Sequence, residues 1–326
     1  MPFALSAEGI RVATLHAELT RKGPGVLLRD IQREKDKQLT ALKEIVTAVD
    51  PDVLLLTKVD FDLERRAAKA LQSYLGFAHS LAVKPNSMMP TELDLDGDGQ
   101  SGDRQTWARF AGEGAMLLLS KQPVHLQFHL NDVLWKDVPS SDRPVHRNGT
   151  PYPSKAAQDA QKLIGQGLWV IKVDMQDEAE IILAAFQNQT PVFDGPEDMN
   201  GLRGRAQLQM LDAIMNNKFG EFPSQRFALI GNANLDPKRG EGDRAAIATL
   251  LSDPRLQDPI PKSALGGDAT AMWENPGPMR VSYILPSRDW IVEQAEVFWP
   301  DQGPLRLAAE RASRHRMIWM DIRQRP

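Results

Sequence analysis

The sequence predicts a layered protein in which β-strands alternate with α-helices along most of the chain. Apolar runs of strand length recur from end to end, and most are nearly continuous, as expected for strands covered on both faces. Segments between several of these runs place apolar residues three and four positions apart behind a charged face, which is typical of amphipathic helices. Because no linker divides the 326 residues, we expect a single domain over residues 1–326.

Each expected element follows from a short stretch of sequence. The strands rest on apolar runs such as DVLLLTKV and EIILAAF, and their ranges are 11–17, 52–59, 115–124, 168–175, 180–186, 226–231, 280–286 and 316–322. The helices rest on the periodic segments 35–49, 61–75, 203–217 and 243–253. Connections rich in Pro, Gly, Asp and Ser cover 84–113, 130–166 and 254–279, and loops this long commonly carry function.

The composition narrows the classes of partner. A net charge of −4, a pI near 5.9 and an aromatic content of 6% argue against a nucleic-acid partner, since no basic stripe interleaved with aromatic residues is present. No apolar run approaches the ~20 residues of a membrane span. The N-terminus lacks the features of a signal peptide, which predicts a cytoplasmic protein, or an exported one if a leader has been removed. The lack of cysteine excludes disulfides and thiolate metal sites.

Seven segments in order carry a resemblance to a known family. They are RVATLHAEL, DPDVLLLTKVDFD, GEGAMLLLSKQPV, TPVFDGPEDMNGLR, ALIGNANLDP, MRVSYILPS and ASRHRMIWMDI. From residue 11 to residue 322 the chain resembles the endonuclease/exonuclease/phosphatase family, which has the DNase I-like fold. The resemblance implies an α+β fold, a four-layer α/β/β/α sandwich of two mainly antiparallel sheets flanked by helices. It also implies a pocket where carboxylates hold one or two divalent ions, a His–Asp pair assists, and water attacks a phosphorus.

The resemblance assigns eight positions to that pocket, and only Asn234 and His315 carry the family's residue. At three positions a carboxylate of the family is replaced by Lys58, Asn232 or Ser282. Arg314 replaces a fourth carboxylate, the aspartate before the final histidine. The remaining two positions carry His16 in place of an asparagine and Gln187 in place of a histidine.

The four replaced carboxylates change the expected chemistry. Mg²⁺ requires hard oxygen ligands and is repelled by an ammonium or a guanidinium, so we expect no magnesium in this pocket. The same side chains suit an anion, and the candidate anion-binding residues are Lys58, Arg314, His16, His315 and Asn234. The alternative is that Lys58 and Arg314 are structural and pair with neighbouring acids.

Two functions follow from this pocket. The first is a non-catalytic binding or structural module, a pseudoenzyme, whose basic pocket holds a phosphate-like or carboxylate anion or contacts a protein partner. The second is an active phosphoesterase with a reorganised site. In that hydrolase His16 and His315 would transfer protons, while Lys58 and Arg314 would act as fixed positive groups.

The loop TELDLDGDGQSGD (91–103) contains the first half of a calcium-loop pattern. Asp94, Asp96 and Asp98 alternate ahead of a glycine, and Asp103 follows. The twelfth position of the pattern falls at Gln105, which lacks a carboxylate. These residues predict a structural Ca²⁺ site, with a solvated acidic turn as the alternative.

Overall fold

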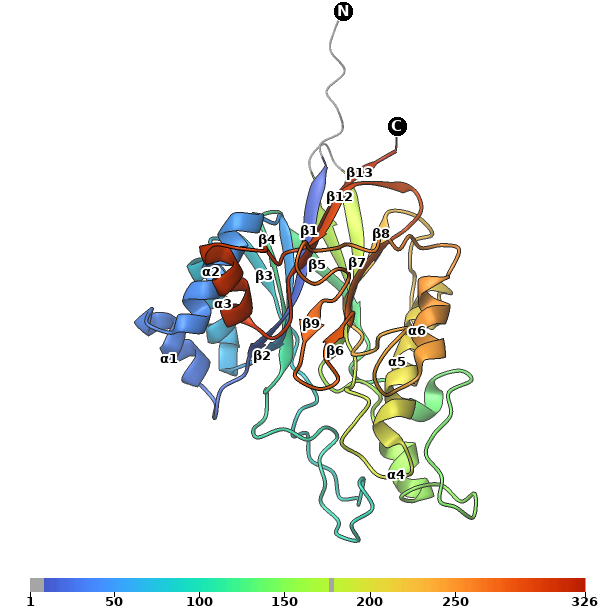
Figure 1. The fold of residues 1–326 in the computed structure, drawn as a ribbon. Coiled ribbons are helices and arrows are strands. Elements are labelled where there is room, and N and C mark those ends of the chain that lie inside the picture. The colour runs from blue at the N-terminus through green and yellow to red at the C-terminus, as the bar shows by residue number, and fades with distance from the viewer. Residues whose placement is uncertain (1–8, 176–178, 326) are drawn as a thin grey trace, which may run out of the picture.

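Two β-sheets pack face to face, and helices cover both outer surfaces (Figure 1). The computed structural model describes residues 9–175 and 179–325. Residues 1–8, which include the start of the segment inspected for a leader, lie outside the described part. The arrangement confirms the expected α+β sandwich of four layers. The expectation of a single domain stays a prediction.

The first sheet has six strands in the order β12-β13-β1-β2-β4-β3. Strands β1 and β2 run parallel, and the other neighbours are antiparallel. The bounds are β1 (Ile10–Leu19), β2 (Val53–Val59), β3 (His79–Leu81), β4 (Ala115–Ser120), β12 (Trp290–Val297) and β13 (Ile318–Gln324).

The second sheet has five strands in the order β11-β8-β7-β6-β5. Strands β7 and β8 run parallel, and the other neighbours are antiparallel. The bounds are β5 (Val124–His129), β6 (Gly167–Asp174), β7 (Glu180–Gln187), β8 (Phe227–Asn232) and β11 (Ser282–Pro286). A separate ribbon pairs β9 (Ala271–Met272) with β10 (Pro278–Met279).

The helices lie in two groups, on the left and right of Figure 1. The first sheet is covered by α1 (Val26–Arg33), α2 (Lys37–Val49), α3 (Arg66–Leu75) and α7 (Pro304–Ala312). The second sheet is covered by α5 (Met199–Met215) and α6 (Arg244–Leu251). The connections contain α4 (Lys155–Ala160) and the 3₁₀ turns η1 (Leu63–Arg65) and η2 (Trp135–Asp137).

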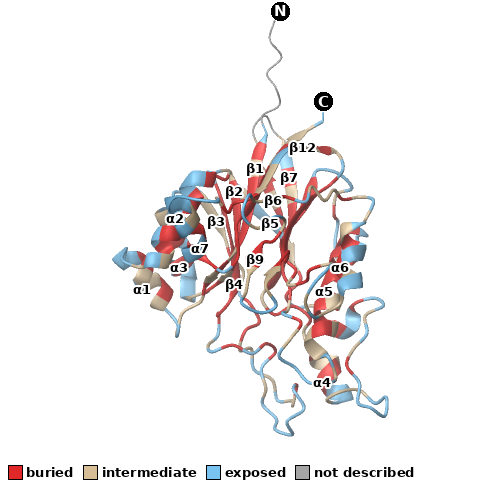
Figure 2. Ribbon diagram, in the orientation of Figure 1, coloured by how far each residue is buried: buried red, intermediate tan, exposed pale blue. Residues whose placement is uncertain are grey.

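Strand β2 shows why the apolar runs are continuous. Side chains alternate between the two faces of a strand. Leu54 and Leu56 pack against the outer helices, whereas Val53 and Leu55 pack between the sheets. Both faces are therefore buried, as the red strands at the centre of Figure 2 show. Lys58 is a half-buried exception near the end of this strand.

Some elements differ from the sequence-based expectation. The run 115–124 is not one strand, because the chain turns after Ser120 and begins β5 at Val124 in the other sheet. The helices α1 and α7 and the strand β12 were not predicted, since polar residues interrupt their apolar pattern. Within residues 9–175 and 179–325, no helix has the length and apolar character needed to cross a membrane.

Candidate functional site

The strand register brings four polar side chains together between the two sheets. His16 is paired with Thr57 across β1 and β2, and Asn232 is paired with Ser282 across β8 and β11. His16, Thr57 and Asn232 continue the alternation of inter-sheet residues along their strands, and Ser282 lies two positions before the inter-sheet residue Ile284. The apolar core between the sheets therefore ends in a polar patch.

Gly231 precedes Asn232 within β8. Its φ is 155°, and a Cβ at this position would lie 1.9 Å from the carbonyl oxygen of Phe186 on the neighbouring strand. Only glycine allows the strand to approach so closely while Asn232 points between the sheets.

The amide of Asn232 determines the protonation state of His16. The Oδ1 atom of Asn232 accepts the backbone N–H of Asn234 at 2.8 Å, so its Nδ2 faces Nδ1 of His16, also at 2.8 Å. Nδ1 must therefore accept, and the ring proton lies on Nε2. Burial, followed by repulsion from His315 and Lys58, lowers the pKa of His16 well below its usual range. His16 is a neutral imidazole at physiological pH.

His315 lies against His16 in the same patch. The two rings are 4.3 Å apart between centroids, and the ring of Trp273 meets His315 edge-on at 5.2 Å. His315 is 3% exposed, and its Nδ1 atom has no hydrogen-bond partner among the described residues. Burial lowers the pKa of His315 to about 4. The hydroxyl of Ser282, which is also buried, has no partner in the described part of the chain either.

Lys58 lies where the two sheets meet. Its backbone is left-handed (φ 62°) at an irregularity in the strand register, and its N–H donates to Oε1 of Gln187 at 3.1 Å. Burial lowers the pKa of the ammonium, and the nearby Glu113 carboxylate only partly offsets this effect. Glu113 is itself held by Arg109 through hydrogen bonds of 2.6–2.9 Å. Among the described residues Lys58 has no ion pair within 4 Å.

Arg314 was predicted from the sequence to bind an anion together with Lys58, but it does not line the cavity that Lys58 lines. Its guanidinium donates to Oε1 of Glu18 from Nε, at 2.9 Å, and from Nη2. The backbone N–H of Arg314 donates to Oε2 of Glu18 at 2.9 Å. The side chain is 65% exposed. Burial raises the pKa of Glu18, but these hydrogen bonds outweigh it and the net shift is downward. Arg314 is therefore neutralised by a residue that the sequence reading did not single out.

A cavity of about 1070 Å³ opens beside this patch. Of the eight positions singled out from the sequence, His16, Lys58, Gln187 and Asn234 line it. The other four, Asn232, Ser282, Arg314 and His315, do not. The loops after β3 and β7 contribute further wall, including the exposed aromatic side chains of Trp107 and Phe193, and the segment before β6 and the start of α5 complete it.

The comparisons with known proteins agree with this architecture. The profile of the Endonuclease/Exonuclease/phosphatase family matches residues 30–315, most of the chain. The chain belongs to this family. A comparison with curated protein sequences finds no match.

Solved structures share the fold of this endonuclease/exonuclease/phosphatase family member. A family protein from Beutenbergia cavernae is 17% identical with a TM-score of 0.58, covering 97% of this chain and 72% of its own. A family protein from Bacteroides thetaiotaomicron is 12% identical with a TM-score of 0.56, covering 99% and 100%. The catalytic domain of human Nocturnin with a bound sulfate anion is 17% identical with a TM-score of 0.50, covering 98% and 94%.

The residues of the patch do not form a ligand set for the divalent ion that the family implies. They offer imidazole, amide, hydroxyl and ammonium groups, whereas Mg²⁺ prefers carboxylate oxygens. The nearest acids, Glu18 and Glu113, are engaged by arginines. Asp60 is buried with one carboxylate oxygen on the backbone N–H of Arg21, and burial raises its pKa to about 6. That no magnesium binds here stays a prediction.

The acidic loop brings together three of its four predicted calcium ligands. Carboxylate oxygens of Asp94, Asp96 and Asp103 lie within 4.8 Å of one another, and Asp98 is not in this group. It is the one such group of histidine or acidic residues within residues 9–175 and 179–325. Gln105 is used elsewhere, since its amide bonds the backbone of Ala160 and Lys162. Calcium binding stays a prediction.

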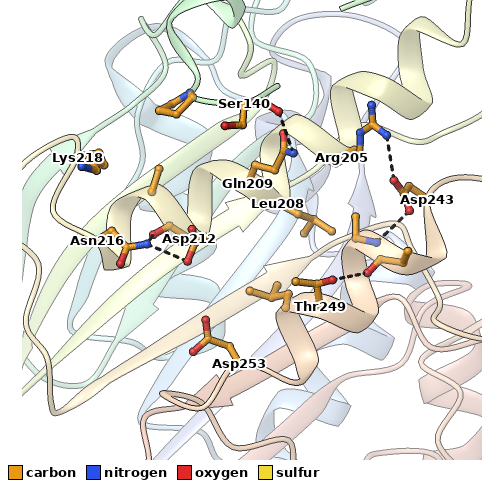
Figure 3. Close-up of a pocket in the computed structure, with 15 residues that line it drawn as sticks. Ser140, Arg205, Leu208, Gln209, Asp212, Asn216, Lys218, Asp243, Thr249 and Asp253 are labelled. Carbon is orange, nitrogen blue, oxygen red and sulfur yellow. Dashed lines mark hydrogen bonds and ion pairs between the residues drawn. The ribbon is translucent and has the colours of Figure 1, made fainter. Parts of the chain in front are cut away.

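A second cavity, of about 520 Å³, lies on the outer side of α5 and α6 (Figure 3). Its arginine, Arg205, pairs with Asp243 at 3.4 Å and with Asp142 at 2.5 Å. Asp212 pairs with Arg255 at 2.5 Å and accepts from Asn216. These charges neutralise one another, in contrast to the ammonium of Lys58, which has no ion pair within the described part of the chain.

Proposed function

We propose that this family member binds a phosphate-like anion at Lys58, without a divalent ion and without metal-dependent hydrolysis. The observation that carries the proposal is the half-buried Lys58 ammonium, which lines a cavity and has no ion pair among the described residues. A partly buried ammonium with no carboxylate in direct contact is costly, and a bound anion reduces that cost.

The electrostatics favour an anion over a cation at this position. At about 4 Å and an effective dielectric of ~20, an anion gains roughly 4 kcal/mol per unit charge from the ammonium, whereas a divalent cation loses twice as much. Neutral His16 carries its proton on Nε2 and lines the same cavity, so it is a further donor. The sulfate in the catalytic domain of human Nocturnin is an anion bound to a protein of the same fold.

Phosphate binding by Lys58→Gln tests the proposal. Wild-type protein, Lys58→Gln and a control, Lys35→Gln, are titrated with inorganic phosphate by calorimetry in EDTA. Lys35 is an exposed lysine away from the cavity. We expect the wild type and the control to bind equally and Lys58→Gln to bind at least about tenfold more weakly, since a charge-assisted hydrogen bond contributes 1.5–3 kcal/mol. Equal affinity of all three proteins would refute the role of Lys58.

The second candidate function is metal-free phosphoester hydrolysis. The specific observation in its favour is the contact between His16 and His315, two neutral imidazoles beside an unpaired cation. His315, whose Nδ1 has no partner among the described residues, would be the base, His16 would donate from Nε2, and the ammonium of Lys58 would offset phosphoryl charge. This hydrolase would turn over phosphodiesters in EDTA and lose activity in His16→Ala, whereas the binding module would do neither.

A further inference from the structure

Arg203 is a buried cation in the cavity of Lys58, and no carboxylate of the described residues pairs with it. It lies in the first turns of α5, is 6% exposed and lines the same cavity. Its Nη2 donates to the carbonyl of Lys162 at 3.0 Å, while its Nε has no hydrogen-bond partner among the described residues. No carboxylate of the described chain lies within 4 Å of its guanidinium. Arg205, two residues later, has two carboxylate partners.

The surroundings of Arg203 leave its charge uncompensated. Burial lowers the pKa of its guanidinium to about 10, and no nearby carboxylate opposes this shift. The ring centroid of Trp135 lies 5.6 Å from the guanidinium carbon. This cation–π contact stabilises the charge less than an ion pair with a carboxylate would. Native proteins rarely leave a buried charge in this state, and an unfilled ligand position is one of the few explanations.

A further buried group on the cavity wall is also without a partner. The Nδ2 donor of Asn188 has none among the described residues. The carbonyl of Asn188 accepts from Nδ2 of Asn234 at 2.7 Å, and both residues line the cavity that Lys58 and Arg203 share. Gln166 contributes to the wall an acceptor, Oε1, which has no partner in the described ranges and suits a hydroxyl or a protonated acid oxygen of a ligand.

We infer that Arg203 marks a second anion subsite, and that the ligand is a small molecule carrying two anionic groups, one for Lys58 and one for Arg203. The inference rests on the proposed function of Lys58 for one of the two groups. A long polyanion does not fit, because carboxylates line the same cavity and would repel a chain leading out of it: Asp96, Asp98, Asp103, Asp194 and Glu197.

Counting bound phosphate tests the second subsite separately from the first. Equilibrium dialysis with radioactive orthophosphate, in EDTA and up to millimolar concentration, is applied to wild-type protein, Lys58→Gln, Arg203→Gln and the double variant. We expect two, one, one and no bound phosphates per chain. If wild type binds one phosphate, loss in Lys58→Gln alone overturns this inference and leaves the proposed function. If that one phosphate is lost in Arg203→Gln alone, the proposed function of Lys58 is overturned and Arg203 is left as an anion site.

Stability provides a readout that a purely structural arginine would not give. Arg203→Met removes the uncompensated charge, so its melting temperature without anions should equal or exceed that of wild type. In saturating phosphate the order should reverse, because the variant loses the stabilisation that binding to the folded state provides. A variant that melts below wild type by the same interval with and without phosphate overturns the inference.

Ligands that span both subsites complete the test. A series of alkane bisphosphonates with one to six methylene groups is compared with orthophosphate in wild-type protein and in Arg203→Lys and Arg203→Gln. At least one member should bind wild type about 100-fold more tightly than orthophosphate, and this gain should be lost in Arg203→Gln and partly kept in Arg203→Lys. If no member exceeds orthophosphate by more than threefold, the inference is overturned.

Discussion

Replacement of His315 by phenylalanine should remove a large acid destabilisation. His315 is 3% exposed, its Nδ1 has no partner within the described chain, and burial lowers its pKa to about 4. Above pH 7 the side chain is neutral in the folded and unfolded states, so its titration contributes nothing. As the pH falls through the ordinary value of 6.5, the unfolded chain binds a proton that the folded protein excludes. Stability is then lost progressively down to about pH 4.

The magnitude follows from the size of the shift. A difference of roughly 2.5 pH units corresponds to about 3 kcal/mol of unfolding free energy at pH 4. Phenylalanine keeps an aromatic ring against His16 and cannot titrate. Urea denaturation of wild type and His315→Phe between pH 7.5 and 4.5 measures the effect, with the exposed His146→Gln as control. Parallel pH profiles for wild type and His315→Phe would refute the reasoning.

Three further predictions concern neighbouring groups. Asn232→Asp replaces the amide donor facing Nδ1 of His16 by an acceptor, so the pKa of His16 should rise by about 1–3 units in an NMR titration, and an unchanged pKa would contradict the assigned tautomer. Burial raises the pKa of Asp60 to about 6, so at pH 8 the folded protein holds a buried charge that Asp60→Asn removes. The variant should therefore gain up to about 3 kcal/mol of unfolding free energy at pH 8 and none at pH 4. An equal unfolding free energy of both proteins at pH 8 would argue against a buried charge. Millimolar Ca²⁺ should raise the melting temperature of wild type but not of Asp94→Asn/Asp103→Asn, and equal responses would exclude the acidic loop as the site.

The strands were predictable because their signal is local, whereas the four-layer arrangement of the two sheets was predicted from the family resemblance. A strand that is covered on both faces is apolar along most of its length, so an apolar run such as VLLLTKV can be recognised as a strand from the sequence alone. The break between β4 and β5 was missed although Lys121, Gln122 and Pro123 form a polar turn signal, and the change of sheet depends on the whole assembly. The edge strand β12 has polar positions facing outward and lacks the signal.

The site was predictable only in part, because it depends on contacts between distant segments. The resemblance located Lys58 and His16, which do line the cavity. It could not reveal that Glu18 neutralises Arg314, since these residues are 296 positions apart. Arg203 was missed because an arginine at the start of a helix is most often exposed, and its burial is a property of the packed structure.

Metal-dependent hydrolysis is the measurement that tests the central claim most directly. Bis(p-nitrophenyl) phosphate is incubated with wild-type protein in magnesium, manganese or calcium, and in EDTA. The account predicts no metal-dependent turnover above a protein-free control. Restoring the carboxylates in Lys58→Glu/Asn232→Asp/Ser282→Asp/Arg314→Asp tests separately whether the scaffold can bind a metal. Turnover by wild-type protein that requires a divalent ion, is abolished by EDTA and is absent in His315→Ala would contradict the account.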